Sequence, residues 1–112
     1  MNLTELVKRA GIHPDMVRYY EHLGILPPSE RTRGGRRAYT EDHVERLVFI
    51  RTCRMVGISL QDIGRLLYFR DRPELARDEI VDLLDGHIAR INDQLVELER
   101  VAEALRSLKG CP

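Results

Sequence analysis

The 112-residue sequence predicts a mainly α-helical protein, in which short helices and one hairpin precede a long coiled-coil helix. Three observations carry this prediction. An apolar seam with a 3.5-residue period runs through the last third of the chain. Two short helical segments meet at Gly11, and an arginine-rich segment surrounds Gly34-Gly35.

The apolar seam of the last third indicates a helix face that needs a partner. Alternating steps of four and three residues give Val81, Leu84, Ile88, Ile91, Leu95, Leu98, Ala102 and Leu105. A helix of about 35 residues would be about 50 Å long at about 1.5 Å per residue, which is too long for the preceding residues to cover. The seam therefore predicts pairing with a second copy of the chain in a homodimer.

Charge and cysteine content narrow the class of protein. Residues 1–56 carry 10 Lys and Arg against 7 Asp and Glu, whereas residues 57–112 carry 8 against 11. This charge distribution favours a first half that binds a polyanion and a second half that forms a solvated dimerisation arm. Cys53 and Cys111 lie too far apart to suggest a disulfide framework or a structural zinc site, and Cys53 is expected in the core. With no membrane span and no signal peptide in the sequence, we expect a cytoplasmic protein without a membrane partner.

The first 24 residues predict two short helices around a glycine turn. Thr4 is expected to cap a helix that runs to Ala10, and a second helix is expected from Pro14 to Leu23, with Gly24 as its stop. Such a helix-turn-helix would place its second helix in the DNA major groove. The residues expected to face the core are Leu6, Val7, Met16, Val17, Tyr20 and Leu23.

The segment that follows predicts a small basic hairpin. Gly34-Gly35 is a hairpin-turn signal with a short strand on either side. Four arginines lie within seven residues, and Tyr39 comes just after them; the arginines are Arg31, Arg33, Arg36 and Arg37. Beside a helix-turn-helix, such a ribbon is typical of a wing that lies against DNA phosphates. The alternative is a mobile, charged surface loop.

Two more helices are predicted before the long one. Thr40 is expected to cap a helix that ends at Gly57, and Ser59 to cap the next, with the stretch Arg70–Pro73 as the break. Their apolar faces are expected to contain Val44, Leu47, Val48, Ile50, Met55, Ile63, Leu66 and Leu67.

Several motifs together resemble the MerR family of bacterial transcription regulators. They are Arg18-Tyr19-Tyr20-Glu21, Gly24-Ile25-Leu26-Pro27-Pro28, Arg31 with Arg33-Gly34-Gly35, Arg37, Tyr39, and the run from Val56 to Ile63. The resemblance covers essentially the whole chain. It implies a winged helix-turn-helix, a helix pair and a long helix that pairs antiparallel with its mate. It also implies that the dimer bends and untwists a promoter whose −35 and −10 elements are too far apart, so that RNA polymerase can use both.

The resemblance also implies which residues contact DNA. Guanidinium groups and phenol hydroxyls suit phosphate oxygens. Tyr19 is assigned either to DNA or to packing, Arg36 replaces the common wing tyrosine, and His13 stands where the family usually has a capping Ser or Thr. The expected DNA-binding residues are Arg18, Tyr19, Tyr20, Arg31, Arg33, Arg36, Arg37, Tyr39 and Arg54.

The end of the chain resembles the metal-sensing branch of that family. Cys111-Pro112 is similar to the start of the metal-binding loop in copper sensors. Candidate effectors are Cu(I), Cd(II), Pb(II) and Hg(II), which soft thiolates bind. However, no second cysteine follows Cys111, and Arg77 stands where other metal sensors have a cysteine. Either the chain is truncated before its metal-binding loop, or the effector is not a metal. In the second case the alternative is a regulator of the same family that answers a redox or thiol-reactive signal, or none.

The predicted organisation follows from these segments. It comprises 1–69, the winged helix-turn-helix with an accessory helix pair; 70–73, a linker; 74–109, the dimerisation helix; and 110–112, the start of an effector-binding tail. The expected partners are double-stranded promoter DNA, a second copy and RNA polymerase. A coiled-coil interaction protein without DNA binding is a further alternative, although it leaves the arginine-rich hairpin without a role. An enzyme is not expected, because no nucleophile–base pair, metal triad or phosphate loop is visible.

Overall fold

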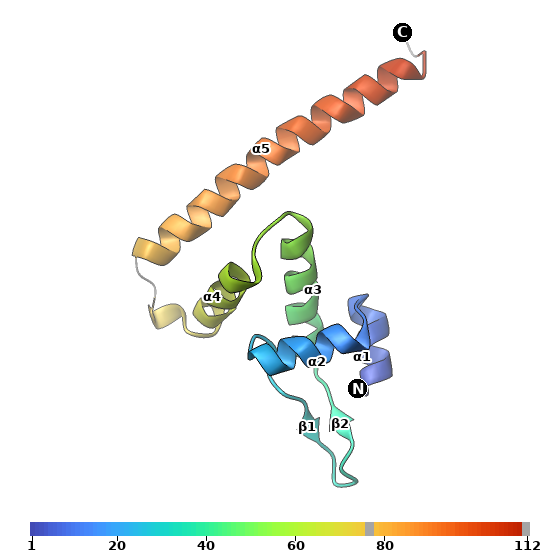
Figure 1. The fold of residues 1–112 in the computed structure, drawn as a ribbon, viewed down its shortest axis with the longest axis vertical. Helices are drawn as coiled ribbons and strands as arrows, with labels where there is room; N and C mark the ends of the chain where they lie inside the picture. The colour runs from blue at the N-terminus through green and yellow to red at the C-terminus, as the bar shows by residue number, and fades with distance from the viewer. Residues whose placement is uncertain (76–77, 111–112) are drawn as a thin grey trace. The chain divides into compact units, whose positions relative to one another are not determined.

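The computed structural model describes residues 1–75 and 78–110, and the chain divides into two units, Met1–Arg72 and Pro73–Pro112. The first unit, called the head below, contains α1 (Leu3–Ala10), α2 (Pro14–Leu23), β1 (Glu30–Arg31), β2 (Arg37–Ala38), α3 (Glu41–Met55) and α4 (Leu60–Asp71) (Figure 1). The second contains a 3-10 turn at Pro73–Leu75 and α5 (Asp78–Leu108). The mainly helical fold with a winged helix-turn-helix, a helix pair and a long helix is thus confirmed.

Glycines end the first two helices as predicted, but the first cap differs. Gly11 and Gly24 adopt left-handed φ values of 67° and 79°, a conformation that costs glycine little because it has no Cβ. The backbone N–H of Glu5 donates to Oδ1 of Asn2 at 2.9 Å, so Asn2 caps α1. The prediction that Thr4 caps this helix is wrong, because the helix already begins at Leu3.

The second helix pair extends further than the sequence indicates. Ser59 caps α4 as predicted, since its Oγ accepts a hydrogen bond from the backbone N–H of Asp62 at 3.1 Å. The helix then continues to Asp71, so residues 70 and 71 of the predicted linker are helical. The long helix begins at Asp78 instead of near residue 74, after the 3-10 turn.

The wing, defined here as residues 30–38, is a short antiparallel hairpin. Glu30 pairs with Ala38 and Arg31 with Arg37. In its turn, the N–H of Thr32 donates to the carbonyl of Arg36 at 2.8 Å. Gly35 has a φ of 75°, which explains why the turn needs glycine. The predicted strands on either side of Gly34-Gly35 are confirmed.

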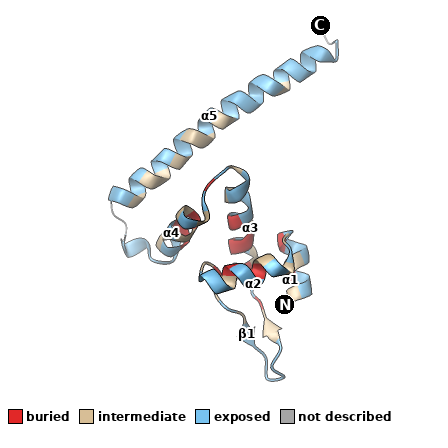
Figure 2. Ribbon diagram, viewed as in Figure 1, coloured by how far each residue is buried: buried red, intermediate tan, exposed pale blue. Residues whose placement is uncertain are grey.

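The core of the head is built from residues of its helices and of the segments that flank the wing (Figure 2). Its buried members are Leu6, Ala10, Val17, Tyr20, Leu26, Tyr39, Leu47, Ile50, Ile58, Ile63 and Leu67. The prediction that Leu23 and Met55 belong to the core is wrong, because their exposed fractions are 44% and 75%. Each is the last residue of its helix, where the apolar stripe passes the edge of the core. Cys53 packs against the core but is half-buried, and burial raises the pKa of its thiol.

The apolar seam of α5 consists of exposed and half-buried residues. The helix has 31 residues, which corresponds to about 46 Å at about 1.5 Å per residue. None of its residues is buried, and Leu95 and Leu98 are 58% and 65% exposed. In the described residues, no helix is long and apolar enough to cross a membrane.

Candidate nucleic-acid interface

The N-terminal end of α2 is capped by the side chain of His13. Nδ1 of His13 accepts a hydrogen bond from the backbone N–H of Asp15 at 3.1 Å. The side chain of Asp15 in turn accepts from Nη1 of Arg18 at 2.9 Å. Arg18 and Tyr19 are exposed on this helix. Arg18 and Tyr19 therefore lie at the surface of a helix in whose first turn the backbone N–H of Asp15 is bonded to the His13 side chain.

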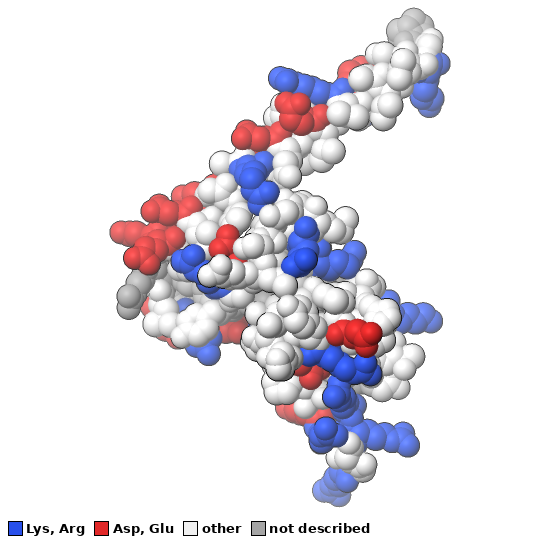
Figure 3. Space-filling view, in the orientation of Figure 1, with Lys and Arg blue, Asp and Glu red and all other residues white. Residues whose placement is uncertain are grey.

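The wing carries exposed arginines. Arg31, Arg33 and Arg36 are all exposed, and Nη1 of Arg31 donates across the turn to the carbonyl of Gly35 at 2.9 Å. Within residues 1–75 and 78–110, neither Arg33 nor Arg36 forms an ion pair. Lys and Arg side chains gather at this end of the head in Figure 3. The wing thus presents guanidinium groups that are available to phosphate oxygens.

A hydrogen-bond chain joins the wing to α2. The hydroxyl of Tyr39 donates to Oε1 of Glu21 at 2.8 Å and accepts from Nη1 of Arg37 at 3.2 Å. Nη1 of Arg37 also lies 4.0 Å from the Glu21 carboxylate. Burial and the bond to Glu21 raise the pKa of Tyr39, against the lowering effect of Arg37. This hydrogen-bond chain was not expected from the sequence, because Glu21 and Tyr39 are 18 residues apart along the polypeptide.

The expected DNA-binding residues divide by exposure. The exposed members are Arg18, Tyr19, Arg31, Arg33, Arg36 and Arg54. Arg37 is half-buried, whereas Tyr20 and Tyr39 are only 3% and 2% exposed. The ring of Tyr20 lies in the core, with its centroid 6.0 Å from that of Tyr19. Both buried tyrosines are therefore placed behind the surface, and DNA contact by all nine residues stays a prediction.

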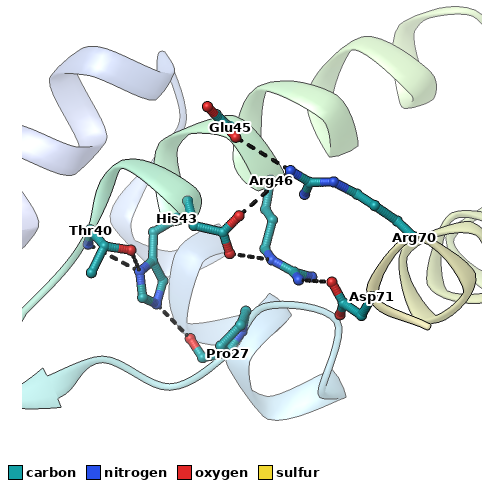
Figure 4. Close-up of polar contacts among 8 residues, drawn as sticks. Pro27, Thr40, His43, Glu45, Arg46, Arg70 and Asp71 are labelled. Carbon is teal, nitrogen blue, oxygen red and sulfur yellow. Dashed lines mark hydrogen bonds and ion pairs between the residues drawn. The ribbon is translucent and has the colours of Figure 1, made fainter. Parts of the chain in front are cut away.

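His43 forms hydrogen bonds with the two segments that flank the wing, at Pro27 and Thr40 (Figure 4). Its Nδ1 accepts from the backbone N–H of Thr40 at 3.1 Å, and its Nε2 lies 2.9 Å from the carbonyl oxygen of Pro27. A carbonyl only accepts, so Nε2 carries the proton. The imidazole also packs edge-on to Tyr39 at 5.2 Å. This residue was missed from the sequence, although its place three residues after Thr40 is the capping-box position.

An ionic cluster joins the first two turns of α3 to the end of α4 (Figure 4). Nε of Arg46 donates to Oδ2 of Asp42 at 2.7 Å, and its Nη2 pairs with Asp71 at the end of α4. Arg70 pairs with Glu45 at 3.3 Å and with Asp42 at 3.5 Å. The side chain of Arg46 is 8% exposed, so its burial depends on these carboxylates. Polar side chains in the first two turns of α3 therefore contact Pro27, which precedes the wing, and Asp71 at the end of α4.

The predicted metal ligand is not described by the structure. Cys111 and Arg77 both lie outside the described residues. Within the described ranges, no group of three His, Cys, Asp or Glu side chains could hold a metal ion.

Comparison with known families agrees with this arrangement of elements. Residues 1–69 match the family described as MerR HTH family regulatory protein, and residues 44–108 match the family described as MerR, DNA binding. The chain belongs to the MerR family. The resemblance inferred from its motifs is confirmed, and this MerR-family chain is a DNA-binding transcriptional regulator and not an enzyme.

Individual relatives of this MerR-family chain include metal-dependent regulators. A probable heavy metal-dependent transcriptional regulator of Haemophilus influenzae is 38% identical over 95% of this chain and 83% of its own length. The structure of PbrR691 from Ralstonia metallidurans in complex with lead(II) is 41% identical, with a TM-score of 0.68 over 97% of this chain and 84% of its own. HiNmlR, a family member lacking the sensor domain and bound to promoter DNA, shares the fold at 23% identity, with a TM-score of 0.76 over 92% of this chain and 78% of its own.

Proposed function

We propose that this regulator is an antiparallel homodimer that binds a pseudo-palindromic promoter element in the cytoplasm. It distorts the spacer DNA and so controls transcription by RNA polymerase. The observation that carries the proposal is the apolar seam of α5, none of whose residues is buried, in a chain whose wing and α2 present exposed arginines. Two-fold symmetry of the protein matches a palindromic site, with one head on each half.

DNA contact is assigned to arginines of α2, the wing and the end of α3, of which all but the half-buried Arg37 are exposed. Arg18, Arg31, Arg33, Arg36, Arg37 and Arg54 are proposed to contact the phosphate backbone, with Tyr19 beside them. Tyr20 and Tyr39 are proposed to support this surface from behind. The hydroxyl proton of Tyr39 already goes to Glu21, so it is not available to a phosphate oxygen.

The dimer is tested by sedimentation equilibrium of matched variants on α5. Leu95→Asp places a charge on the seam, whereas Val96→Asp makes the same change one residue away and off the seam. The two side chains have similar exposure, 58% and 52%. We expect Leu95→Asp to give a monomer and Val96→Asp to keep a dimer. A wild-type chain that sediments as a monomer at micromolar concentration contradicts the proposal.

DNA binding and distortion are tested on the promoter region upstream of the regulated gene. We expect a mobility shift that weakens steeply with salt. A circular-permutation assay should report a bend, and the topoisomer distribution of a plasmid bearing the site should report untwisting. Absence of any shift at low salt would favour the coiled-coil interaction protein without DNA binding.

A soft metal ion is the proposed effector, with the Cys111 thiolate as one ligand. The lead(II) complex of PbrR691 and the metal-dependent relatives support this assignment. Titration with Pb(II), Cd(II), Cu(I) and Hg(II) tests it, with Cys111→Ser as the probe and Cys53→Ser as the matched control. We expect tight binding that is lost only in Cys111→Ser, because burial raises the pKa of the Cys53 thiol and disfavours its thiolate.

Two results would redirect the effector assignment. Metal binding that survives Cys111→Ser removes this residue from the site. Absence of binding favours the second candidate, a regulator that answers a redox or thiol-reactive signal, or none.

A further inference from the structure

We propose that Glu21 is a positioning residue for DNA binding, which orients Arg37 through the hydroxyl of Tyr39. The proposal rests on the proposed function, because it takes Arg37 as a phosphate contact. Glu21 lies on α2, Arg37 is on β2, and Tyr39 follows β2 in the core. The three residues therefore connect α2 to the wing.

The direction of this hydrogen-bond chain is fixed by its members. The Tyr39 hydroxyl has one proton, and the Glu21 carboxylate accepts it at 2.8 Å. A lone pair of the hydroxyl oxygen is then left for Nη1 of Arg37 at 3.2 Å. Arg37 therefore donates to Tyr39, and Tyr39 donates to Glu21. Without the carboxylate, the phenol proton is free to rotate toward Arg37 and to oppose its N–H groups.

In this hydrogen-bond chain, Tyr39 and Glu21 are more buried than Arg37. Tyr39 is 2% exposed and packs edge-on to His43, which is itself bonded to Pro27 and Thr40. The side chain of Glu21 is 16% exposed, whereas that of Arg37 is 37% exposed. A guanidinium has five N–H donors, and only Nη1 of Arg37 has a hydrogen-bond partner in the described part of the chain. Its other donors are available for phosphate.

This arrangement explains why an acidic residue lies beside a basic DNA-binding surface. A carboxylate near phosphates repels them, so Glu21 weakens binding if it acts through its charge alone. If it acts by fixing Arg37 before DNA arrives, it strengthens binding, since less side-chain freedom is lost in the complex. The two effects have opposite signs, and a substitution distinguishes them.

The test is a double-mutant cycle on promoter DNA with the full chain. The variants are Glu21→Ala, Glu21→Gln, Tyr39→Phe and the double variant Glu21→Ala with Tyr39→Phe. Glu30→Ala, at the exposed carboxylate of β1, is the matched control for removal of a negative charge in the wing. Urea unfolding of each variant checks that it is folded under the binding conditions.

A positioning role predicts a particular pattern. Glu21→Ala should weaken binding about 3- to 10-fold. Glu21→Gln should bind nearly as the wild type, because its amide oxygen still accepts the phenol proton. Adding Glu21→Ala to Tyr39→Phe should cause no further loss. The salt slope of Glu21→Ala should stay at the wild-type value, because Arg37 keeps its charge, whereas Arg37→Ala should lower it by about one.

A readout without DNA comes from the spectrophotometric titration of the tyrosines. The bond to Glu21 raises the pKa of Tyr39, so Glu21→Ala should lower it. Additive effects of the two substitutions, equal losses in Glu21→Gln and Glu21→Ala, or tighter binding by Glu21→Ala would overturn the proposal. If Glu21→Ala does not fold, the Glu21→Gln and Tyr39→Phe variants still decide it, since only the second should weaken binding.

Failure of this proposal is distinguishable from failure of the proposed function. If Arg37→Ala weakens binding and Glu21→Ala does not, the positioning role alone is wrong. If Arg37→Ala has no effect on binding or on its salt slope, the phosphate contact of Arg37 is wrong and the positioning role falls with it.

Discussion

Arg46 on α3 forms an ion pair with Asp71, the last residue of α4. The guanidinium side chain is 8% exposed, while the side chain of Asp71 is 38% exposed and that of Asp42 is 50% exposed. A buried cation is thus held by two carboxylates that reach the surface. The pair fixes the last turn of α4 against α3, next to Arg72, where the head ends.

Removal of this cation should destabilise the head. In Arg46→Ala, the two carboxylates lose their partner and a cavity is left, but both can turn toward water. We therefore expect a loss of about 1–3 kcal/mol in the free energy of unfolding, less than for a fully buried pair. Urea unfolding measures it. Arg100→Ala is the control, because its pair with Glu97 is exposed and should contribute within about 0.5 kcal/mol. Equal losses in the two variants would contradict the assigned role.

Stability should depend on pH through Asp42. Its hydrogen bond to Arg46 holds the pKa of Asp42 below the ordinary value of 3.8. A carboxyl with a lowered folded-state pKa contributes stability above its unfolded pKa and loses that contribution as pH falls through the folded one. Urea unfolding between about pH 5 and pH 2 should therefore show a shallower decline in Asp42→Asn than in the wild type. The same decline in both would show that the bond does not contribute.

Arg37→Ala should weaken binding to all DNA sequences alike. A phosphate contact carries no sequence information, so specific and random duplexes should lose affinity by similar factors. The slope of log affinity against log salt should fall by about one charge. Fluorescence anisotropy over a salt series measures both, with Arg100→Ala as a matched control on α5. An unchanged slope would show that Arg37 does not neutralise a phosphate.

The histidine cap of α2 should be replaceable by other capping residues. His13→Ala removes the acceptor for the N–H of Asp15 and should cost about 1 kcal/mol of stability. His13→Ser should recover most of this loss, because a serine hydroxyl satisfies the same backbone donors. Thermal unfolding compares the three proteins. A serine variant as unstable as the alanine variant would mean that the imidazole acts by packing instead.

The sequence predicts this fold well where local rules decide it. Gly11, Gly24 and Ser59 end or begin helices through backbone conformation and capping, which depend on a few neighbours. The period of the seam predicts α5 in the same way. Local rules fail at helix ends: Asn2 caps α1 in place of Thr4, and Met55 lies outside the core. Neither outcome follows from periodicity, because the first depends on where α1 begins and the second on where α3 passes the edge of the core.

The candidate site is less predictable, because it depends on distant pairs. The family resemblance implies that Tyr39 contacts DNA, but its hydroxyl donates to Glu21, 18 residues away. Arg46 is buried beside Asp42 of the same helix and Asp71, which is 25 residues away and follows from no local pattern. Exposed arginines of the wing are the part that composition alone predicts.

The apolar seam of α5 has a consequence for gene dosage. No residue of α5 is buried within its own chain, so in the proposed homodimer this helix is covered by a second molecule. Below the dissociation constant of the dimer, the concentration of competent dimer varies with the square of the total protein, so doubling the amount of regulator gives about four times as much dimer. Promoter occupancy would then respond more steeply than one-to-one to the amount of regulator in the cell, without any cooperativity between promoters.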